Sequence, residues 1–210
     1  MRSHRWKLHR AFYQCLFIAT AFVVLGGCHS VPITPASDLE ISEPIPVTVG
    51  IYYPPGFKSH TFIEWTYGIE PFFYPLGEAS TDVLDLAFRK LFKTVVVLRA
   101  LRDTKPTTVA LAGIIEPSIE EFKIEFSKDW SYRYSAEITF RFTLYSPSGE
   151  RLTNWSIRGS GAGYGDFFHF SRPRGEAAAG AIARAAESFA FHFEDSLEVR
   201  QWLGTIRKQE

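Results

Sequence analysis

The chain has 210 residues, 46% of them hydrophobic, with 23 basic and 23 acidic side chains and two cysteines. Four basic residues and no acidic ones lie in the first 27 positions, so the 183 residues that follow carry 19 basic and 23 acidic side chains, a formal charge of −4. This balance argues against nucleic acid as a partner and against a polybasic patch for anionic lipid. A chain of this length can bury a core that holds one domain together without disulfides.

The first 28 residues have the pattern of a secretory signal. A basic start leads into the almost entirely apolar residues 11–24, and Leu25-Gly26-Gly27-Cys28 ends the run. This ending resembles the lipobox of bacterial prolipoproteins, which implies that Cys28 is lipidated and becomes the first mature residue. His29 stands where an aspartate would resemble the inner-membrane retention signal, so the resemblance implies anchoring at the outer membrane.

Three other interpretations of this segment remain open. A retained transmembrane helix needs about 20 apolar residues, and this run is shorter before the chain becomes polar and rich in proline. Cleavage without lipidation would leave Cys28 as an ordinary thiol, and an internal core helix would have to contain Gly26 and Gly27. If the signal is removed, Cys15 leaves with it, and we expect no disulfide and no thiolate metal site in the folded part.

The chain after the signal divides into a tether and one domain. Four prolines lie among polar residues between 28 and 46, a composition that favours an extended, unpacked spacer. At about 3.1 Å per residue, such a spacer would reach roughly 50 Å from the bilayer. We therefore expect a signal peptide at 1–27, a proline-rich tether at 28–46, a single domain at 47–205 and a tail at 206–210.

The residue pattern in the first half of the domain predicts strands before and after one helix. Alternating or β-branched patterns indicate strands at 47–53, 61–67, 69–74 and 94–97. Residues 77–81 are predicted to be the entry to a helix, with Ser80 or Thr81 as its N-cap and Asp82 in its first turn. Its apolar stripe recurs at helical spacing through Leu84, Phe88, Leu91 and Val95.

The second half predicts an antiparallel sheet followed by a helix. Polar and apolar side chains alternate strictly over residues 131–145, the strongest strand pattern in the chain. Further strands are expected at 109–115, at 121–126 and through Trp155 and Ile157, and helices at 176–193 and 196–203. This order is typical of an α+β fold. We predict one two-layer domain, with a largely antiparallel sheet and two main helices on one of its faces.

Motifs for catalysis are weak. Gly159, Gly161, Gly163 and Gly165 alternate, but no helix follows at once as in a phosphate-binding loop, and we interpret the tract as a flexible strand end or bulge. The histidines after Cys28 have no partner at metal-ligand spacing. Two acidic pairs, Glu120-Glu121 and Glu194-Asp195, are interpreted as solvated charges. We expect no catalytic residue, no metal site and no cofactor.

Aromatic residues are the most distinctive feature of the domain. Nine of them lie within residues 52–74, and three more lie within residues 167–170 around His169. For Phe72 and Phe73 we favour the interpretation that they belong to the core. Aromatic side chains in loops are harder to bury and are enriched at protein interfaces. The candidate partner contacts are Phe167, Phe168, Phe170, Trp65 and Tyr67.

The layout of a lipidated cysteine, a short tether and a small α+β domain resembles accessory lipoproteins of the Gram-negative envelope, such as those of lipopolysaccharide assembly and curli secretion. Cys28 is the one functional residue that the resemblance carries over. It implies a non-enzymatic, periplasm-facing lipoprotein that binds an envelope protein or assembles with copies of itself. The alternatives are a module that binds a glycan or lipid through aromatic segments 52–74 and 167–170, and, third, a hydrolytic enzyme.

Overall fold

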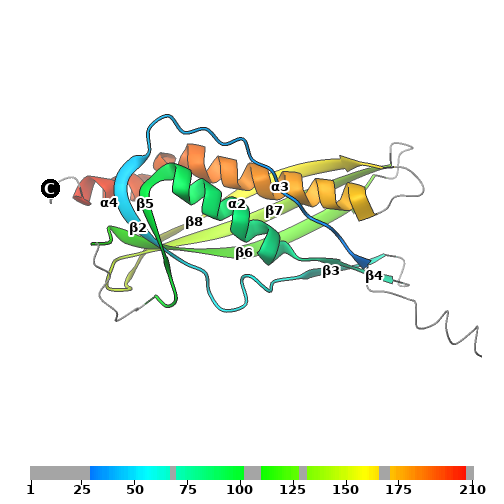
Figure 1. Ribbon diagram of the computed structural model, residues 1–210, viewed down its shortest axis with the longest axis horizontal. Helices are drawn as coiled ribbons and strands as arrows, with labels where there is room; N and C mark the ends of the chain where they lie inside the picture. Colours follow the sequence, from blue (N-terminus) through cyan, green and yellow to red (C-terminus); the bar gives the residue numbers. More distant parts are fainter. Residues whose placement is uncertain (1–28, 67–69, 102–109, 128–131, 166–170, 207–210) are drawn as a thin grey trace, which may run out of the picture.

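The computed structural model describes residues 29–66, 70–101, 110–127, 132–165 and 171–206, and the structural statements below concern these ranges. Figure 1 shows an elongated molecule in which long strands and two long helices run in the same general direction. In chain order the elements are β1 (His29–Ser30), β2 (Ile45–Tyr52), β3 (Phe62–Thr66), β4 (Glu70–Tyr74), α2 (Leu76–Leu91), β5 (Phe92–Leu98), β6 (Gly113–Phe126), β7 (Arg133–Tyr145), β8 (Arg151–Tyr164), α3 (Ser171–His192), η1 (Phe193–Asp195) and α4 (Leu197–Ile206).

The larger of the two sheets has the strand order β5-β2-β6-β7-β8. β6, β7 and β8 form two long antiparallel ladders, whereas β2 pairs in parallel with β5 and with β6. Parallel neighbours need a crossover connection, and α2 provides it between β2 and β5. The predicted α+β class and the largely antiparallel sheet are confirmed, with the parallel pairs at β2 as an addition.

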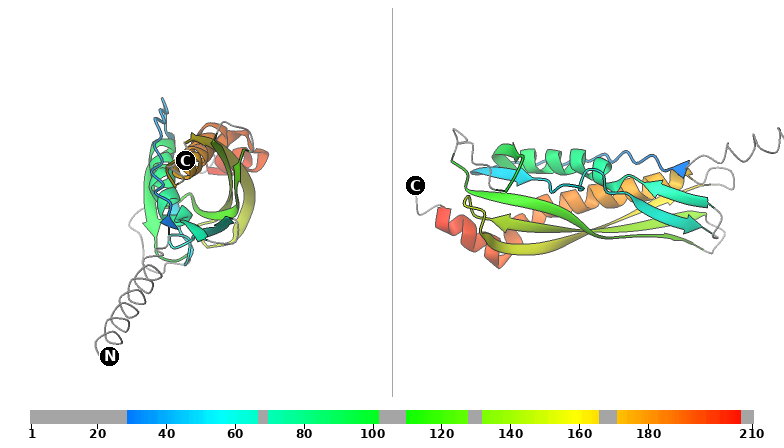
Figure 2. Two further views of the ribbon diagram at one scale, coloured as in Figure 1. Left: turned by 90° about the vertical axis from the view of Figure 1, so that its right-hand side faces the viewer. Right: turned by 90° about the horizontal axis from the view of Figure 1, so that it is seen from below.

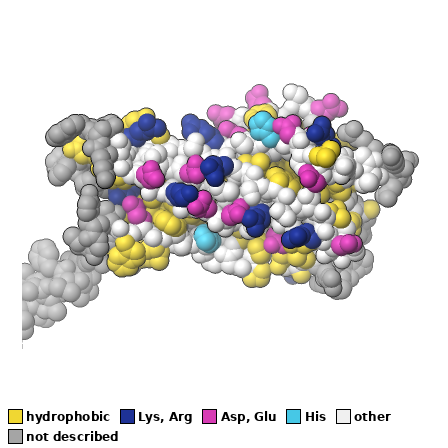
Figure 3. All heavy atoms as spheres, turned by 180° about the vertical axis from the view of Figure 1, so that it is seen from behind, with side chains coloured by type: hydrophobic (Ala, Val, Ile, Leu, Met, Phe, Trp, Pro, Cys, Tyr) yellow, Lys and Arg dark blue, Asp and Glu magenta, His cyan; other side chains and the backbone are white. Residues whose placement is uncertain are grey.

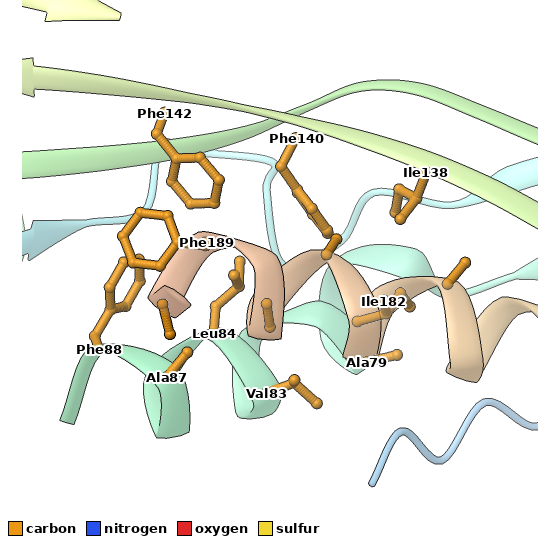
Figure 4. Packing of buried hydrophobic residues seen from close by; sticks show 14 of the residues in the cluster. Ala79, Val83, Leu84, Ala87, Phe88, Ile138, Phe140, Phe142, Ile182 and Phe189 are labelled. Carbon is orange, nitrogen blue, oxygen red and sulfur yellow. The ribbon is translucent and has the colours of Figure 1, made fainter. Parts of the chain in front are cut away.

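Helices α2 and α3 both lie on the apolar face of this sheet, as predicted. Figure 2 shows the sheet curving around α3, with α2 beside it. Phe142 of β7 meets Phe189 of α3 at a ring-centroid distance of 4.4 Å, and Phe88 of α2 meets the same ring at 5.2 Å. Figure 4 shows Phe140 and Ile138 of β7 pointing toward the same helices. The core therefore lies between the sheet and the two helices.

The predicted beginning of α2 is wrong by several residues. The helix begins at Leu76 after Pro75, while Ser80 and Thr81 are buried inside it. The Thr81 hydroxyl donates to the carbonyl of Gly77 at 2.8 Å instead of capping the helix. Packing explains the difference, because Leu76 is fully buried and its burial favours an earlier helix start than capping propensity alone predicts. Val95 lies in β5 and not on the helix.

The interpretation of the glycine tract as a flexible end or bulge is also wrong. Gly159, Gly161 and Gly163 lie in the regular ladder between β7 and β8. A Cβ atom on Gly159 or Gly161 would stand 2.1 Å from a backbone carbonyl oxygen of α3, and one on Gly163 would stand 1.9 Å from another. The glycines therefore let the backbone of α3 lie directly on β8.

Residues 31–44 differ from the expected unpacked tether. Val31 is fully buried, Leu39 is 5% exposed, and the N–H of Val31 donates to the carbonyl of Phe73 at 2.9 Å. The hydroxyl of Ser37 donates to Glu187 of α3 at 3.1 Å. The segment runs extended along the helices in Figure 1. The composition of this segment predicted a free spacer, but its few apolar side chains pack into the core that the rest of the chain forms.

No helix in the described ranges is both long enough and apolar enough to cross a membrane. Cys28 and the expected signal at 1–27 lie outside those ranges, as do residues 207–210 of the expected tail.

Candidate functional site

A second, smaller sheet lies at one end of the molecule. We call this end, where the described chain begins with β1, the β1 end. Its strand order is β1-β4-β3, with His29 and Ser30 opposite Phe72 and Phe73 in a parallel pair. β3 is one of its two edge strands, and the side chains of β3 alternate between partly buried and exposed. Phe62 and Glu64 are partly buried, whereas the side chains between and after them are exposed, Ile63 by 46% and Trp65 by 65%.

A buried arginine connects the small sheet to α3 and β7. Arg174 is 2% exposed, and its Nε lies 3.1 Å from a carboxylate oxygen of Glu64. Its guanidinium lies between two rings, 4.0 Å from the centroid of Phe72 and 4.3 Å from that of Tyr134. The hydroxyl of Tyr74 donates to the same carboxylate. Burial, followed by this hydrogen bond, raises the pKa of Tyr74 far above its ordinary value.

The arrangement around Arg174 holds two parts of the fold together. An arginine at 2% exposure cannot meet a soluble substrate, and the three neighbours Glu64, Phe72 and Tyr134 come from three different strands. A buried charge needs a partner and hydrogen bonds, which Glu64 supplies. Nothing in the spacing of residues 64 and 174 predicts that they meet, so this group could not be found from the sequence.

Most of the aromatic segment 52–74 belongs to the core. Phe57, Phe72 and Tyr74 are buried, and Phe73 is partly buried. The hydroxyl of Tyr53 donates to Asp85 at 2.6 Å. Among the described aromatic residues of the segment, the ring of Trp65 is the one that is exposed.

Of the five predicted partner contacts, Trp65 lies in the described part of the chain and is exposed. Tyr67, Phe167, Phe168 and Phe170 lie outside it, as does His169.

Further apolar side chains that the sequence analysis did not single out are exposed at the β1 end. Tyr164 at the end of β8 is 64% exposed, and Phe126 at the end of β6 is 40% exposed. Arg133 pairs with Tyr164 across β7 and β8, with its guanidinium 5.9 Å from the ring centroid. The left-hand side of Figure 3 is the β1 end seen from behind, and hydrophobic side chains gather there. In the sequence these residues lie at the ends of predicted strands. The strands continue there past the part of the sheet that the helices cover.

The opposite end of the molecule, which we call the α4 end, has an open sheet edge. β5 is one of the two outermost strands of the larger sheet, and no other strand among the described residues pairs with its outer side. Its seven residues include three valines and one charged side chain, Lys93. Val97 is 53% exposed, and Thr94 is also exposed.

A shallow depression of about 470 Å³ lies near this edge. It is lined by the start of β2, the residues before β6, the β7–β8 turn and α4. The indole of Trp202 donates to the carbonyl of Ala112 at 3.3 Å, and Leu152 at the rim is 47% exposed. The described residues that line it include no histidine and no charged side chain.

Several charged side chains on the outer face of the larger sheet form exposed pairs. Glu120 accepts from Arg141 and from Ser156, and Glu121 pairs with Lys123 at 2.8 Å, on the outer face of the sheet. Acidic and basic side chains alternate across the middle of that face in Figure 3.

A histidine–acid pair near the end of α3 lies at the surface. His192 and Asp195 are 2.7 Å apart, with side chains 63% and 73% exposed. Within the described ranges no group of three or more His, Cys, Asp or Glu residues could hold a metal ion.

The chain matches no known family model and no curated protein. In layout it resembles small bacterial lipoproteins of solved structure. A DUF330-family protein of Xanthomonas campestris has 10% identity and a TM-score of 0.47, over 88% of this chain and 99% of that one. A minor lipoprotein of Acinetobacter baumannii has 6% identity and a TM-score of 0.44, over 73% and 94%. The PelC dodecamer of Paraburkholderia phytofirmans has 12% identity and a TM-score of 0.35, over 72% and 93%. At these values the likeness concerns the arrangement of elements alone.

Proposed function

We propose that this chain is a non-enzymatic lipoprotein, anchored through Cys28 to the outer membrane and facing the periplasm, which binds a second protein chain along the edge of β5. The lipobox Leu25–Cys28 supports the anchor. The open edge of β5 supports the binding. The two features together favour a role in holding or assembling an envelope component over a role in chemistry.

The edge of β5 has the properties of a strand that accepts another strand. An edge strand presents unpaired N–H and C=O groups, and natural proteins usually protect such edges with charges, proline or a bulge. β5 has no proline and one lysine, and its β-branched residues favour extended pairing. Addition of a partner strand would satisfy the backbone groups, with Val97 as an apolar contact. The occupant is therefore an extended segment of a protein.

A charge on the exposed edge tests the proposal. Val97 is 53% exposed, so Val97→Lys should keep the fold while it places an ammonium group beside the cross-strand side chains of an added partner strand. We expect the complex crosslinked in intact cells to fall about tenfold, which corresponds to about 1.4 kcal/mol. Leu197→Lys, which places the same charge on a side chain that is 59% exposed in α4, is the matched control and should keep the complex.

The mass of the crosslinked species separates a second copy of this chain from another envelope protein. An undiminished complex in a folded Val97→Lys variant would show that the β5 edge is not the binding site.

The anchor is tested separately by Cys28→Ser, which should abolish lipid labelling and release the protein from membranes.

A further inference from the structure

We infer that the β1 end lies on the bilayer, with Trp65, Ile63 and Tyr164 in contact with the lipid interface. The inference rests on the proposed lipid anchor at Cys28 and adds an orientation to it. Its three supports are the short link between the anchor and the core, the exposed side chains at this end, and their charge.

The first support is the length of chain between the anchor and the folded core. Val31 is fully buried and hydrogen-bonded to the carbonyl of Phe73, and it follows Cys28 by three residues. Three extended residues span at most about 10 Å. A lipid on Cys28 would therefore hold the β1 end close to the headgroups, in contrast to the roughly 50 Å that a free tether of residues 28–46 would allow.

The second support is the chemistry of the surface that this link brings to the membrane. Trp65 is 65% exposed, Tyr164 is 64% exposed and Ile63 is 46% exposed. Tryptophan and tyrosine are the side chains most enriched at membrane–water interfaces, because each has an apolar body and a polar group. Exposed in water these rings lower solubility, whereas at the headgroup boundary they bury apolar area.

Shared contacts bring these residues to one end of the fold. The guanidinium of Arg174 contacts Phe72 of β4 and Tyr134 of β7. The neighbour of Tyr134, Arg133, pairs with Tyr164 of β8. Figures 1 and 2 show β1, β3 and β4 beside these ends of β7 and β8.

The third support is charge, which decides the kind of lipid surface. Glu125 and Arg133, both exposed at the ends of β6 and β7, carry opposite charges. The chain after the signal has a formal charge of −4. The contact is thus one of aromatic and apolar side chains with the interface of any bilayer, and anionic headgroups are not needed to attract it.

Single cysteines with an environment-sensitive label test the orientation. The full-length protein is processed in cells, purified and reconstituted in vesicles of phosphatidylethanolamine and phosphatidylglycerol that contain a nitroxide lipid. Trp65→Cys and Ile63→Cys report the β1 end, and Leu197→Cys, at an exposed apolar residue of α4, is the matched control. Circular dichroism checks the fold of each variant. We expect nitroxide quenching to be several times stronger at positions 65 and 63 than at position 197.

Equal quenching at positions 65, 63 and 197 in protein that floats with the vesicles would overturn the orientation and leave the anchor intact. The parent protein decides the anchor itself, because Cys28 takes no label when it is acylated. A parent that takes label and does not float would refute the lipid anchor, and the membrane contact with it. Replacing phosphatidylglycerol by phosphatidylcholine should leave the quenching pattern unchanged. If the stronger quenching at positions 65 and 63 disappears with that replacement, the contact depends on lipid charge and the inference is refuted in that respect.

Discussion

The two sheets of this protein are joined to its helices by different means. The larger sheet meets α3 through backbone contact at Gly159, Gly161 and Gly163 and through an apolar core. The smaller sheet meets α3 through Arg174, a buried cation held by Glu64 and two rings. Apolar packing is insensitive to pH and depends on shape, whereas the ionic contact depends on both partners being present and charged. A substitution at the glycine contact should therefore act through shape, and a substitution at Arg174 or Glu64 should act through charge.

The largest expected effect comes from filling the space between β8 and α3. In Gly161→Ala the new Cβ would lie 2.1 Å from the carbonyl oxygen of Ala177 and 2.4 Å from the amide nitrogen of Ala181. Backbone atoms cannot rotate away, so α3 has to move, and we expect a loss of about 3 kcal/mol. Urea unfolding measures it.

Gly204→Ala in α4 is the control for that change, because a Cβ there meets no atom within 4 Å. Alanine is a better helix former than glycine by about 1 kcal/mol, so this variant should be as stable as the parent or more stable. A similar loss in both variants would show that the contact between β8 and α3 is looser than described.

The next largest effect separates the ionic contact from the apolar one. Arg174→Met leaves the carboxylate of Glu64 without its buried cation. Because Glu64 is 21% exposed, we expect a loss of about 2–3 kcal/mol, below the value for a fully buried pair. The double variant Arg174→Met, Glu64→Gln should recover part of this loss. Additive effects of the two substitutions would mean that the pair contributes no coupling.

A neighbouring residue of the same helix is the control for the arginine. Arg172 pairs with Glu176 at 2.8 Å, but its side chain is 81% exposed. Exposed pairs of this kind contribute little, so Arg172→Met should change the free energy of unfolding by less than about 0.5 kcal/mol.

The smallest effect is a pH dependence confined to alkaline solution. Burial and the hydrogen bond to Glu64 raise the pKa of Tyr74 above the ordinary value of 10.0. The fold therefore favours the neutral phenol, and its contribution is complete below pH 10 and is lost as pH rises above it. Tyr74→Phe should show a shallower fall of the urea midpoint above pH 10 than the parent.

Part of that alkaline fall should remain in Tyr74→Phe. Burial and Asp85 also raise the pKa of Tyr53, so its contribution has the same sign. An identical alkaline fall in Tyr74→Phe and the parent would contradict the link between Tyr74 and stability.

Strand periodicity predicted the larger sheet well. The alternation over 131–145 corresponds to β7, and the inward positions of Phe140 and Phe142 follow from it. A period of two determines which face of a strand is buried, whatever the neighbours. Of the candidate contacts, Trp65 lies in the described part of the chain and is exposed, whereas the exposure of Tyr164 at the end of β8 did not follow from any local pattern.

By itself the sequence determined the class of fold and the buried face of the central strands, because each depends on local patterns of residue type, and the same kind of local pattern carries the proposed lipid anchor at Cys28. The tertiary structure alone decided the rest. Glycines in β8 acquire their role from a helix ten or more residues away, and Arg174 meets Glu64 across 110 positions. The segment after Cys28 packs because the core offers pockets for Val31 and Leu39. Such contacts depend on the shapes and charges of surfaces far apart in the chain, and no local pattern contains them.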